Sequence, residues 1–156
     1  MKKKLLCGIL IASMVIGISG CSIFNVFNTK REGKLVVNLL ENDNVMDKYM
    51  NAIEEYDDFE CEEVYYDWGG RSIGPTEYRY RGIIYLTDEE AQRLWDKYEW
   101  AEYTSPSFEF EKIDISDIGD GPWYYCNEFN SDNYSTIVSS YTVFDGEKIV
   151  FDIHQI

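Results

Sequence analysis

The spacing of apolar residues changes several times after residue 33, and each spacing predicts a type of element. Alternating apolar and polar residues fit a strand, whereas an apolar residue at every third or fourth position fits a helix. Strand-like segments bounded by turn residues occur at 34–40, 59–68, 77–86, 107–115, 123–129 and 136–144, with a last strand after Asp145-Gly146. The Asp-Gly pair is typical of a two-residue hairpin turn, so we expect the last two strands to be adjacent.

Two segments have helical spacing instead. The first begins at Asp43 or Asn44, either of which is able to cap a helix, and has an apolar stripe within residues 45–56. In the second, Thr87 and Glu90 have the spacing of a capping box, in which each side chain accepts a hydrogen bond from a free amide at the helix start. The predicted buried stripe of this helix consists of Ala91, Leu94, Trp95 and Tyr98.

These elements together predict the fold class α+β, a mostly antiparallel sheet with two helices packed on it. Glycine- and proline-containing loops at residues 69–75 and 117–122 separate the predicted strands. The close spacing of the turn signals in the second half is typical of an antiparallel meander. Since no repeat or change of composition interrupts this part of the chain, we predict that residues 34–156 form a single domain.

The first residues have a different pattern. Lys2, Lys3 and Lys4 are followed by an apolar run over residues 5–18, and Ser19-Gly20 then precede Cys21. This order of basic, apolar and small residues is typical of a secretory signal peptide. The apolar run is shorter than the roughly 20 residues that a helix needs to cross the hydrocarbon core of a membrane.

Ile18-Ser19-Gly20-Cys21 resembles the lipobox of bacterial lipoproteins, an aliphatic residue and two small residues before a modified cysteine. The resemblance implies that the thiol of Cys21 receives a diacylglycerol, that residues 1–20 are cleaved off, and that residues 21–33 are a lipidated tether. It also implies attachment to the extracytoplasmic face of the cell membrane or the outer membrane. A secreted protein with an incidental Cys21 and an uncleaved anchor helix are the alternatives.

The chain is strongly acidic, with 14 basic and 29 acidic residues. Loss of residues 1–20 removes three lysines and no acid, which leaves 11 basic against 29 acidic residues and a net charge of −18. Lys30, Arg31 and Lys34 cluster beside the predicted anchor. Because nucleic acids are bound through basic residues that neutralise phosphates, we expect no nucleic-acid partner. The acidic surface is explained by solubility alone or by an interaction.

Two cysteines, Cys61 and Cys126, belong to the predicted domain. Export to an oxidising compartment permits a disulfide between them. Two buried thiols would give the same sequence pattern, because spacing does not fix the geometry that a disulfide requires. Both alternatives stay open at this point.

The sequence contains no recognisable catalytic or metal-binding motif, and we expect no cofactor and no catalytic residue. Its single histidine, His154, lies in the last predicted strand without a marked nucleophile. One histidine and two separated cysteines do not make a tetrahedral zinc site. Asp114, Asp117 and Asp120 do not have EF-hand spacing, so an ordinary polar turn is favoured over a calcium site.

Aromatic residues are abundant, with 13 Tyr, 8 Phe and 4 Trp. Several lie beside predicted loops, where aromatic side chains with nearby polar groups are able to grip sugars or peptides. The candidate binding surface consists of Trp68, Arg71, Trp123, Tyr124 and Tyr125. The alternative is that both tryptophans fill the ends of the sheet core.

Three functional hypotheses follow. The favoured one is a non-catalytic, lipid-anchored domain of the bacterial cell envelope, which binds an envelope protein or a glycan and the membrane through the lipid on Cys21. The alternative is a carboxylate-dependent hydrolase acting on envelope polymers, since acidic pairs are the machinery of many glycosidases. A purely structural role within an envelope assembly is the third.

Overall fold

The computed structural model describes residues 33–155 apart from 70–76, 105, 117 and 135–138. The predicted signal peptide, the lipobox with Cys21 and residues 22–32 of the tether lie outside this description, as does Arg71. Within the described part of the chain, no helix has the length and apolar character needed to cross a membrane.

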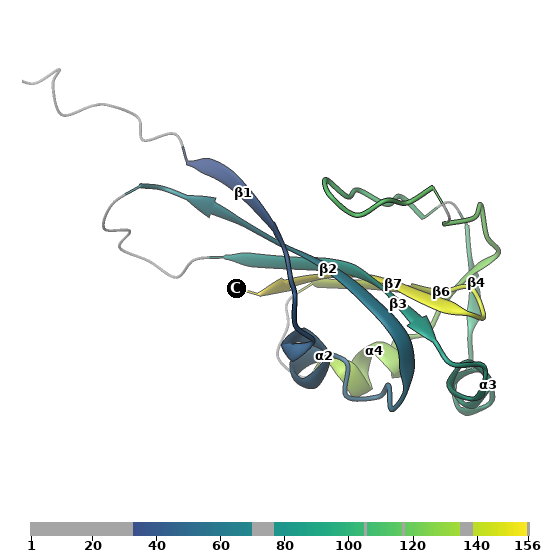
Figure 1. The fold of residues 1–156 in the computed structure, drawn as a ribbon. Coiled ribbons are helices and arrows are strands. Elements are labelled where there is room, and N and C mark those ends of the chain that lie inside the picture. Colours follow the sequence, from purple (N-terminus) through teal and green to yellow (C-terminus); the bar gives the residue numbers. More distant parts are fainter. Residues whose placement is uncertain (1–32, 70–76, 105, 117, 135–138, 156) are drawn as a thin grey trace, which may run out of the picture. The chain divides into compact units, whose positions relative to one another are not determined.

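A seven-stranded sheet organises the described residues, and every strand pair in it is antiparallel (Figure 1). The spatial order is β1-β2-β3-β7-β6-β5-β4, so β1 and β4 are the two edge strands. Pairing of β3 with β7 joins the first half of the chain to the second. The strands span Lys34–Leu39 (β1), Tyr56–Asp67 (β2), Tyr78–Leu86 (β3), Ala101–Tyr103 (β4), Trp123–Tyr125 (β5), Ser139–Phe144 (β6) and Lys148–Gln155 (β7).

Three helices accompany the sheet in the described residues: Asn44–Tyr49 (α2), Asp88–Lys97 (α3) and Asn127–Asn133 (α4). The α+β class is therefore confirmed, with one helix more than expected. The start of α3 follows the predicted cap, because the Thr87 hydroxyl accepts a hydrogen bond from the Glu90 amide at 3.2 Å. The Glu90 carboxylate, however, accepts a hydrogen bond from the backbone N–H of Glu54, at 2.8 Å.

The predicted strand over residues 123–129 is wrong in its second half. The strand ends at Tyr125, and the helix α4 begins at Asn127. Buried positions of this segment recur at helical spacing, but two of them are asparagines, so the apolar pattern did not reveal them. The Asn133 side chain joins the segment to its surroundings, since it donates to the Phe129 carbonyl and accepts from the Ala52 amide, both at 2.8 Å.

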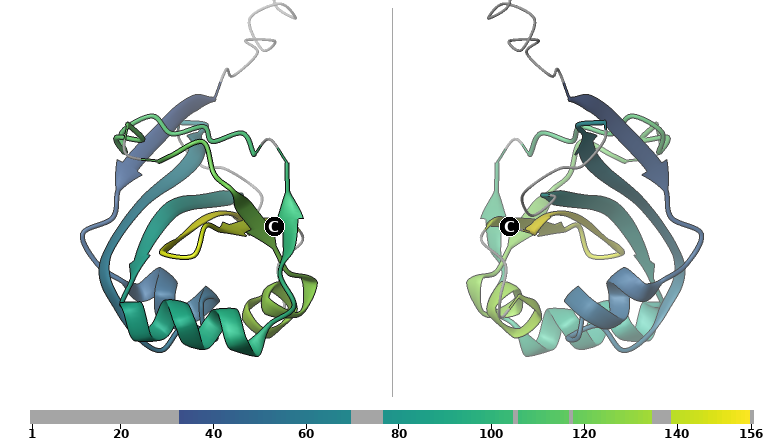
Figure 2. Two further views of the ribbon diagram at one scale, coloured as in Figure 1. Left: turned by 90° about the vertical axis from the view of Figure 1, so that its right-hand side faces the viewer. Right: turned by 90° about the vertical axis from the view of Figure 1, so that its left-hand side faces the viewer.

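The predicted strand over residues 107–115 is also wrong, since no strand is found there. This segment lies over one face of the sheet (Figures 1 and 2). The backbone amides of Glu111, Lys112 and Ile113 donate to the carboxylate of Glu62 rather than to a neighbouring strand. Phe108 and Phe110 pack on buried side chains of the sheet, so their alternation with glutamates reflects this contact and not the pairing of a strand.

Strands β2, β3 and β7 present two chemically different faces. Cys61, Gly82 and Phe151 lie in one row across them, and Glu62, Arg81 and Asp152 lie in the next row, on the opposite face. We call these the apolar face and the groove face. Two buried clusters correspond to them. The larger includes Ile84, Phe151, Met46, Leu94 and Phe129; the smaller consists of Ile83, Ile113, Trp123, Val143 and Val150.

Candidate functional site

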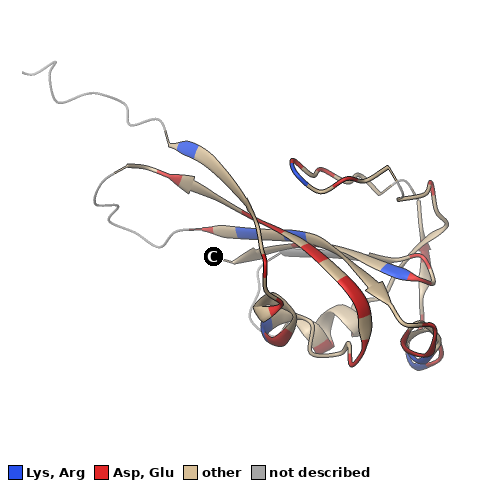
Figure 3. Cartoon of the chain, viewed as in Figure 1, with Lys and Arg blue, Asp and Glu red and all other residues tan. Residues whose placement is uncertain are grey.

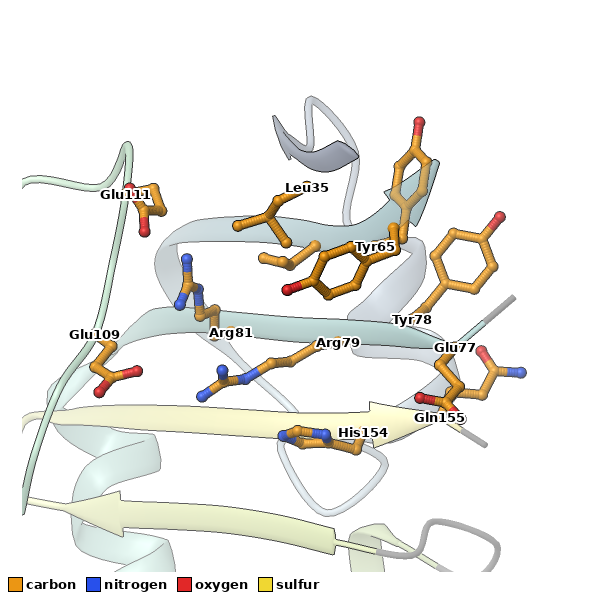
Figure 4. A pocket seen from close by; sticks show the side chains of 12 residues that line it. Leu35, Tyr65, Glu77, Tyr78, Arg79, Arg81, Glu109, Glu111, His154 and Gln155 are labelled. Atoms are coloured by element: carbon orange, nitrogen blue, oxygen red, sulfur yellow. The ribbon is translucent and has the colours of Figure 1, made fainter. Parts of the chain in front are cut away.

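A groove of about 410 Å³ opens on the groove face (Figure 4). Strands β1, β2, β3 and β7 provide its floor, and the segment 109–111 provides a wall. Its lining combines apolar, aromatic and charged side chains: Leu35, Val64, Tyr65, Tyr66, Glu77, Tyr78, Arg79, Arg81, Glu109, Glu111, His154 and Gln155. A concave site with this mixture of contacts is suited to binding another molecule.

One cluster of charge in the groove is centred on Asp152. The guanidinium of Arg79 donates to both oxygens of the Asp152 carboxylate, with its Nε 2.7 Å from Oδ1. This contact raises the pKa of Arg79, in spite of the opposing effect of burial. The Nε2 atom of His154 lies 3.4 Å from the same Oδ1 atom. Because the side chains of Arg79 and His154 are 31% and 45% exposed, both remain accessible to a ligand.

A second charged cluster builds the wall of the groove. Both the Nε and an Nη atom of Arg81 lie 2.9 Å from Oε2 of Glu62. The Glu62 carboxylate also accepts hydrogen bonds from three successive amides, those of Glu111, Lys112 and Ile113. Since the Glu62 side chain is fully buried, this network compensates a charge that would otherwise be costly to bury.

The protonation of Glu62 follows from these contacts. Burial alone would raise the pKa of its carboxyl group, because the charged form loses water. The three amides and the Arg81 guanidinium outweigh burial, so the pKa is lowered below its ordinary value of 4.5. Glu62 is therefore an ionised anchor for the segment 111–113 at neutral pH.

Three further carboxylates, those of Glu77, Glu109 and Glu111, belong to the lining but form no ion pair with any residue that the structure describes. The two arginines of the groove are already paired, with Asp152 and Glu62. Glu109 lies near enough to Arg79 to help raise its pKa, but Asp152 is the ion-pair partner of Arg79. The groove therefore offers acidic groups that form no ion pair among the described residues and are able to meet a cationic ligand. Figure 3 shows acidic residues distributed over many of the surrounding strands and helices as well.

The structure separates the residues of the predicted aromatic surface. Trp68 is 49% exposed and its ring stacks on that of Tyr66, at a centroid distance of 5.9 Å, beside the groove. Trp123 is only 2% exposed and packs against Phe108, so its assignment to a binding surface is wrong and the core alternative applies. Its strand, β5, is separated from β2 by three intervening strands.

The two tyrosines that follow Trp123 are partly buried. The ring of Tyr124 meets that of Trp95 edge to face, at 4.8 Å, beside a hollow between α3 and the β6–β7 turn. The Tyr125 ring lies 6.1 Å from that of Tyr103. Neither tyrosine lines the groove, so the predicted surface is not one site.

Cys61 and Cys126 are both buried and both free in the structure, which therefore contains no disulfide between them. Burial, together with the neighbouring carboxylates of Glu62 and Glu63, raises the pKa of Cys61 to about 12. A thiol held in its protonated form is a poor nucleophile, which agrees with a purely structural role for this residue.

Metal-binding groups are not found among the described residues, where no three His, Cys, Asp or Glu side chains gather around a point. Asp117, one of the aspartates considered for calcium, lies outside the described residues. Asp114 accepts a hydrogen bond from the Ser116 amide at 2.9 Å, and this contact lowers its pKa. That bond within the chain is typical of a polar turn.

The sequence reasoning missed Glu62, Arg79, Arg81 and Asp152 as a group. A signal was present, because Arg79 and Arg81 alternate with tyrosines along one strand and acids occur at matching positions of other strands. Recognising it required the register of β2, β3 and β7, which apolar patterns alone do not supply.

No protein family model matches this chain, and no curated protein or solved structure is significantly similar to it.

Proposed function

We propose that this chain is a lipid-anchored protein on the extracytoplasmic side of a bacterial cell membrane or outer membrane, and that residues 34–156 form a non-catalytic binding domain. The order of basic, apolar and small residues before Cys21 supports the anchor. The groove supports the binding role and takes the place of the aromatic surface expected from the sequence.

The groove is suited to an extended polypeptide segment that carries basic side chains. The observation that carries this proposal is that the groove's arginines are paired with Asp152 and Glu62, whereas Glu77, Glu109 and Glu111 form no ion pair with the described residues. Lysine or arginine side chains of a partner would compensate these acids, and its apolar side chains would cover Leu35 and Val64. A neutral glycan would leave the acidic charges without a counterpart. We therefore favour an envelope protein as the partner.

We also infer that α2, α3 and α4 pack on the apolar face of the sheet. Their side chains Met46, Leu94 and Phe129 belong to the same buried cluster as Ile84 and Phe151 of the strands, which supports this arrangement. Helices on one face would leave the other face free for the groove. The strands would thus serve stability on one side and binding on the other.

The alternative, a carboxylate-dependent hydrolase acting on envelope polymers, predicts two facing acids of which one has a raised pKa. The pKa shifts found for carboxyl groups of the described residues, at Glu62, Glu90 and Asp114, are all downward. A facing pair of acids in which one has a raised pKa would favour hydrolysis over the binding role.

The proposal is tested by photo-crosslinking in cells that produce the full-length chain. A benzophenone amino acid placed at Tyr66, in the groove, should form an adduct with an envelope protein. The same amino acid at Trp95, which is exposed on α3, serves as the control and should not yield that adduct. An adduct that contains a glycan, or equal yields from both positions, would contradict a polypeptide ligand in the groove.

The contribution of the acidic charges is tested separately. The double variant Glu109→Gln/Glu111→Gln removes two of them and should lower the adduct yield from Tyr66 about tenfold, since each exposed pair contributes up to about 1 kcal/mol. The matched double variant Glu89→Gln/Glu99→Gln changes two exposed glutamates outside the groove and should leave the yield unchanged.

A further inference from the structure

The strand β1 has an unpaired edge in the part of the chain that the structure describes. Its other side pairs with β2, and the Leu40 amide continues this ladder by donating to the Cys61 carbonyl at 2.9 Å. Because alternate residues of an antiparallel strand point to opposite sides, residues 34, 36, 38 and 40 bond to β2. The backbone groups of Leu35, Val37 and Leu39 therefore point away from the sheet.

This edge has few of the features that normally keep edge strands from pairing with other chains, since its only charged residue, Lys34, is at its start. Its sequence, KLVVNL, contains no proline, and the register with β2 runs from Lys34 to Leu39 without a bulge. Leu35 and Leu39 are 44% and 51% exposed, and their side chains lie on the groove face with that of Val37. An open ladder next to exposed leucines favours the addition of another strand.

The order of the side chains along this edge is self-complementary. We propose that two copies of this chain pair through β1 in antiparallel orientation, around a two-fold axis that passes beside Val37. In this register Leu35 of each copy faces Leu39 of the other, and the two Val37 side chains face each other. All three apolar residues then lie in one continuous strip across the new strand pair.

The charges at the two ends of β1 fit the same orientation. Lys34 begins the strand, whereas Glu41 and Asp43 follow its end and line a hollow of about 480 Å³ with Asp57 and Asp58. Antiparallel pairing brings Lys34 of each copy next to Leu40 and the acidic hollow of the other. Parallel pairing would place the two lysines together and the two acidic ends together, and is disfavoured.

The pairing has a consequence for the groove. A two-fold axis between antiparallel strands of one sheet is perpendicular to that sheet, so the two grooves open on the same side. Leu35 lines the groove, and in the dimer it gains Leu39 of the second copy as a neighbour. The dimer itself does not depend on what the groove binds.

Disulfide trapping of the full-length chain in detergent micelles tests the register. In this register only residue 37 lies opposite the same residue of the second copy. The Cα atoms of the two residues 37 would be about 5.5 Å apart, a separation that suits a disulfide. Mild oxidation of Val37→Cys should therefore give a covalent dimer in high yield. Leu35→Cys alone and Leu39→Cys alone should give no more dimer than the wild type, while a mixture of these two variants should give a covalent heterodimer.

The mass of the complex provides a second measurement that needs no crosslink. Analytical ultracentrifugation should find the wild-type chain as a dimer and Val37→Lys as a monomer, because the substitution places two ammonium groups against each other at the axis. A native circular dichroism spectrum of Val37→Lys shows that its fold is intact. A monomeric wild type, or equal trapping of Leu35→Cys and Val37→Cys, would overturn the proposal.

Discussion

Alternate residues of strands β2, β3 and β7 point to opposite faces of the sheet, and the buried side chains of the two faces are stabilised by different contacts. On the apolar face, Phe151 and Ile84 are fully buried among other apolar side chains. On the groove face, Glu62 and Arg81 are almost as completely buried, but they are held by an ion pair and by backbone amides. The groove face therefore has a polar form of burial, at Glu62 and Arg81, in addition to the apolar burial that both faces have.

The difference teaches how a groove is maintained on a folded domain. Apolar packing closes space, because side chains adapt until few voids remain. The buried carboxylate of Glu62 has a different effect. Its hydrogen bonds fix the positions of three backbone amides and thereby hold the segment 111–113 above the sheet. The space that remains between this segment and β1 is the groove.

Phe151→Ala should have the largest effect, because it removes a fully buried ring from the apolar face. We expect a loss of about 4 kcal/mol in the free energy of unfolding, measured by urea denaturation. The ring also stacks on Phe59 and packs closely against Gly82, so its removal leaves a cavity between these two residues. A loss below 1 kcal/mol would show that this face does not carry the stability of the domain.

Glu62→Gln should have the next largest effect and acts on the groove face. The amide has nearly the shape of the carboxylate but leaves Arg81 buried without a counter-charge, which costs about 3 kcal/mol in unfolding free energy. Urea denaturation at pH 7 measures the loss. The matched control, Glu63→Gln, changes the neighbouring glutamate, which is only partly buried, and should cost much less.

Acid should weaken the polar network before the apolar face. Glu62 and Glu90 have pKa values lowered below the ordinary 4.5, so each stabilises the folded state fully above about that pH. This stability is lost as the pH falls through the lowered values, because the carboxylates are then protonated. Urea denaturation between pH 7 and pH 2 should show the decline, and Glu62→Gln should reduce its size. Equal pH dependence in both proteins would contradict the role of Glu62.

Trp68→Ala should have the smallest effect on stability. The side chain is half exposed and stacks on one tyrosine, so we expect a change of about 0.5 kcal/mol in unfolding free energy. Trp123→Ala is its counterpart and should cost about 3 kcal/mol, since that ring belongs to the smaller buried cluster. Similar costs for both variants would mean that the assignment of Trp68 to the surface is wrong.

Much of the fold was predictable because apolar alternation marks strands that have one buried side. Strands β1, β2, β3, β6 and β7 and the helix α3 were anticipated in type and approximate position. The helix cap was recognised at Thr87, whose hydroxyl bonds to the Glu90 amide as expected, whereas the Glu90 carboxylate bonds to the Glu54 amide and does not complete the capping box. Local patterns sufficed in these places since the burial of each segment is nearly regular.

The failures concern segments in which polar side chains are buried. Asn130 and Asn133 occupy buried positions of α4, and the amides of residues 111–113 bond to a glutamate far away in the sequence. The spacing of apolar residues does not identify buried positions that carry polar side chains. The site was missed for the same reason, because Glu62, Arg81 and Asp152 meet only through the pairing of three strands. The lipid anchor at Cys21 lies outside the described residues and stays a prediction.

Hydrogen exchange at residues 111–113 tests most directly whether a buried carboxylate holds the groove open. The amides of these residues should exchange slowly in the wild-type protein at neutral pH, although they belong to no helix or strand. In Glu62→Gln they should exchange on the order of a hundredfold faster, while the amides of β3 and β7 remain protected. Rapid exchange in the wild type, or unchanged exchange in the variant, would contradict the account.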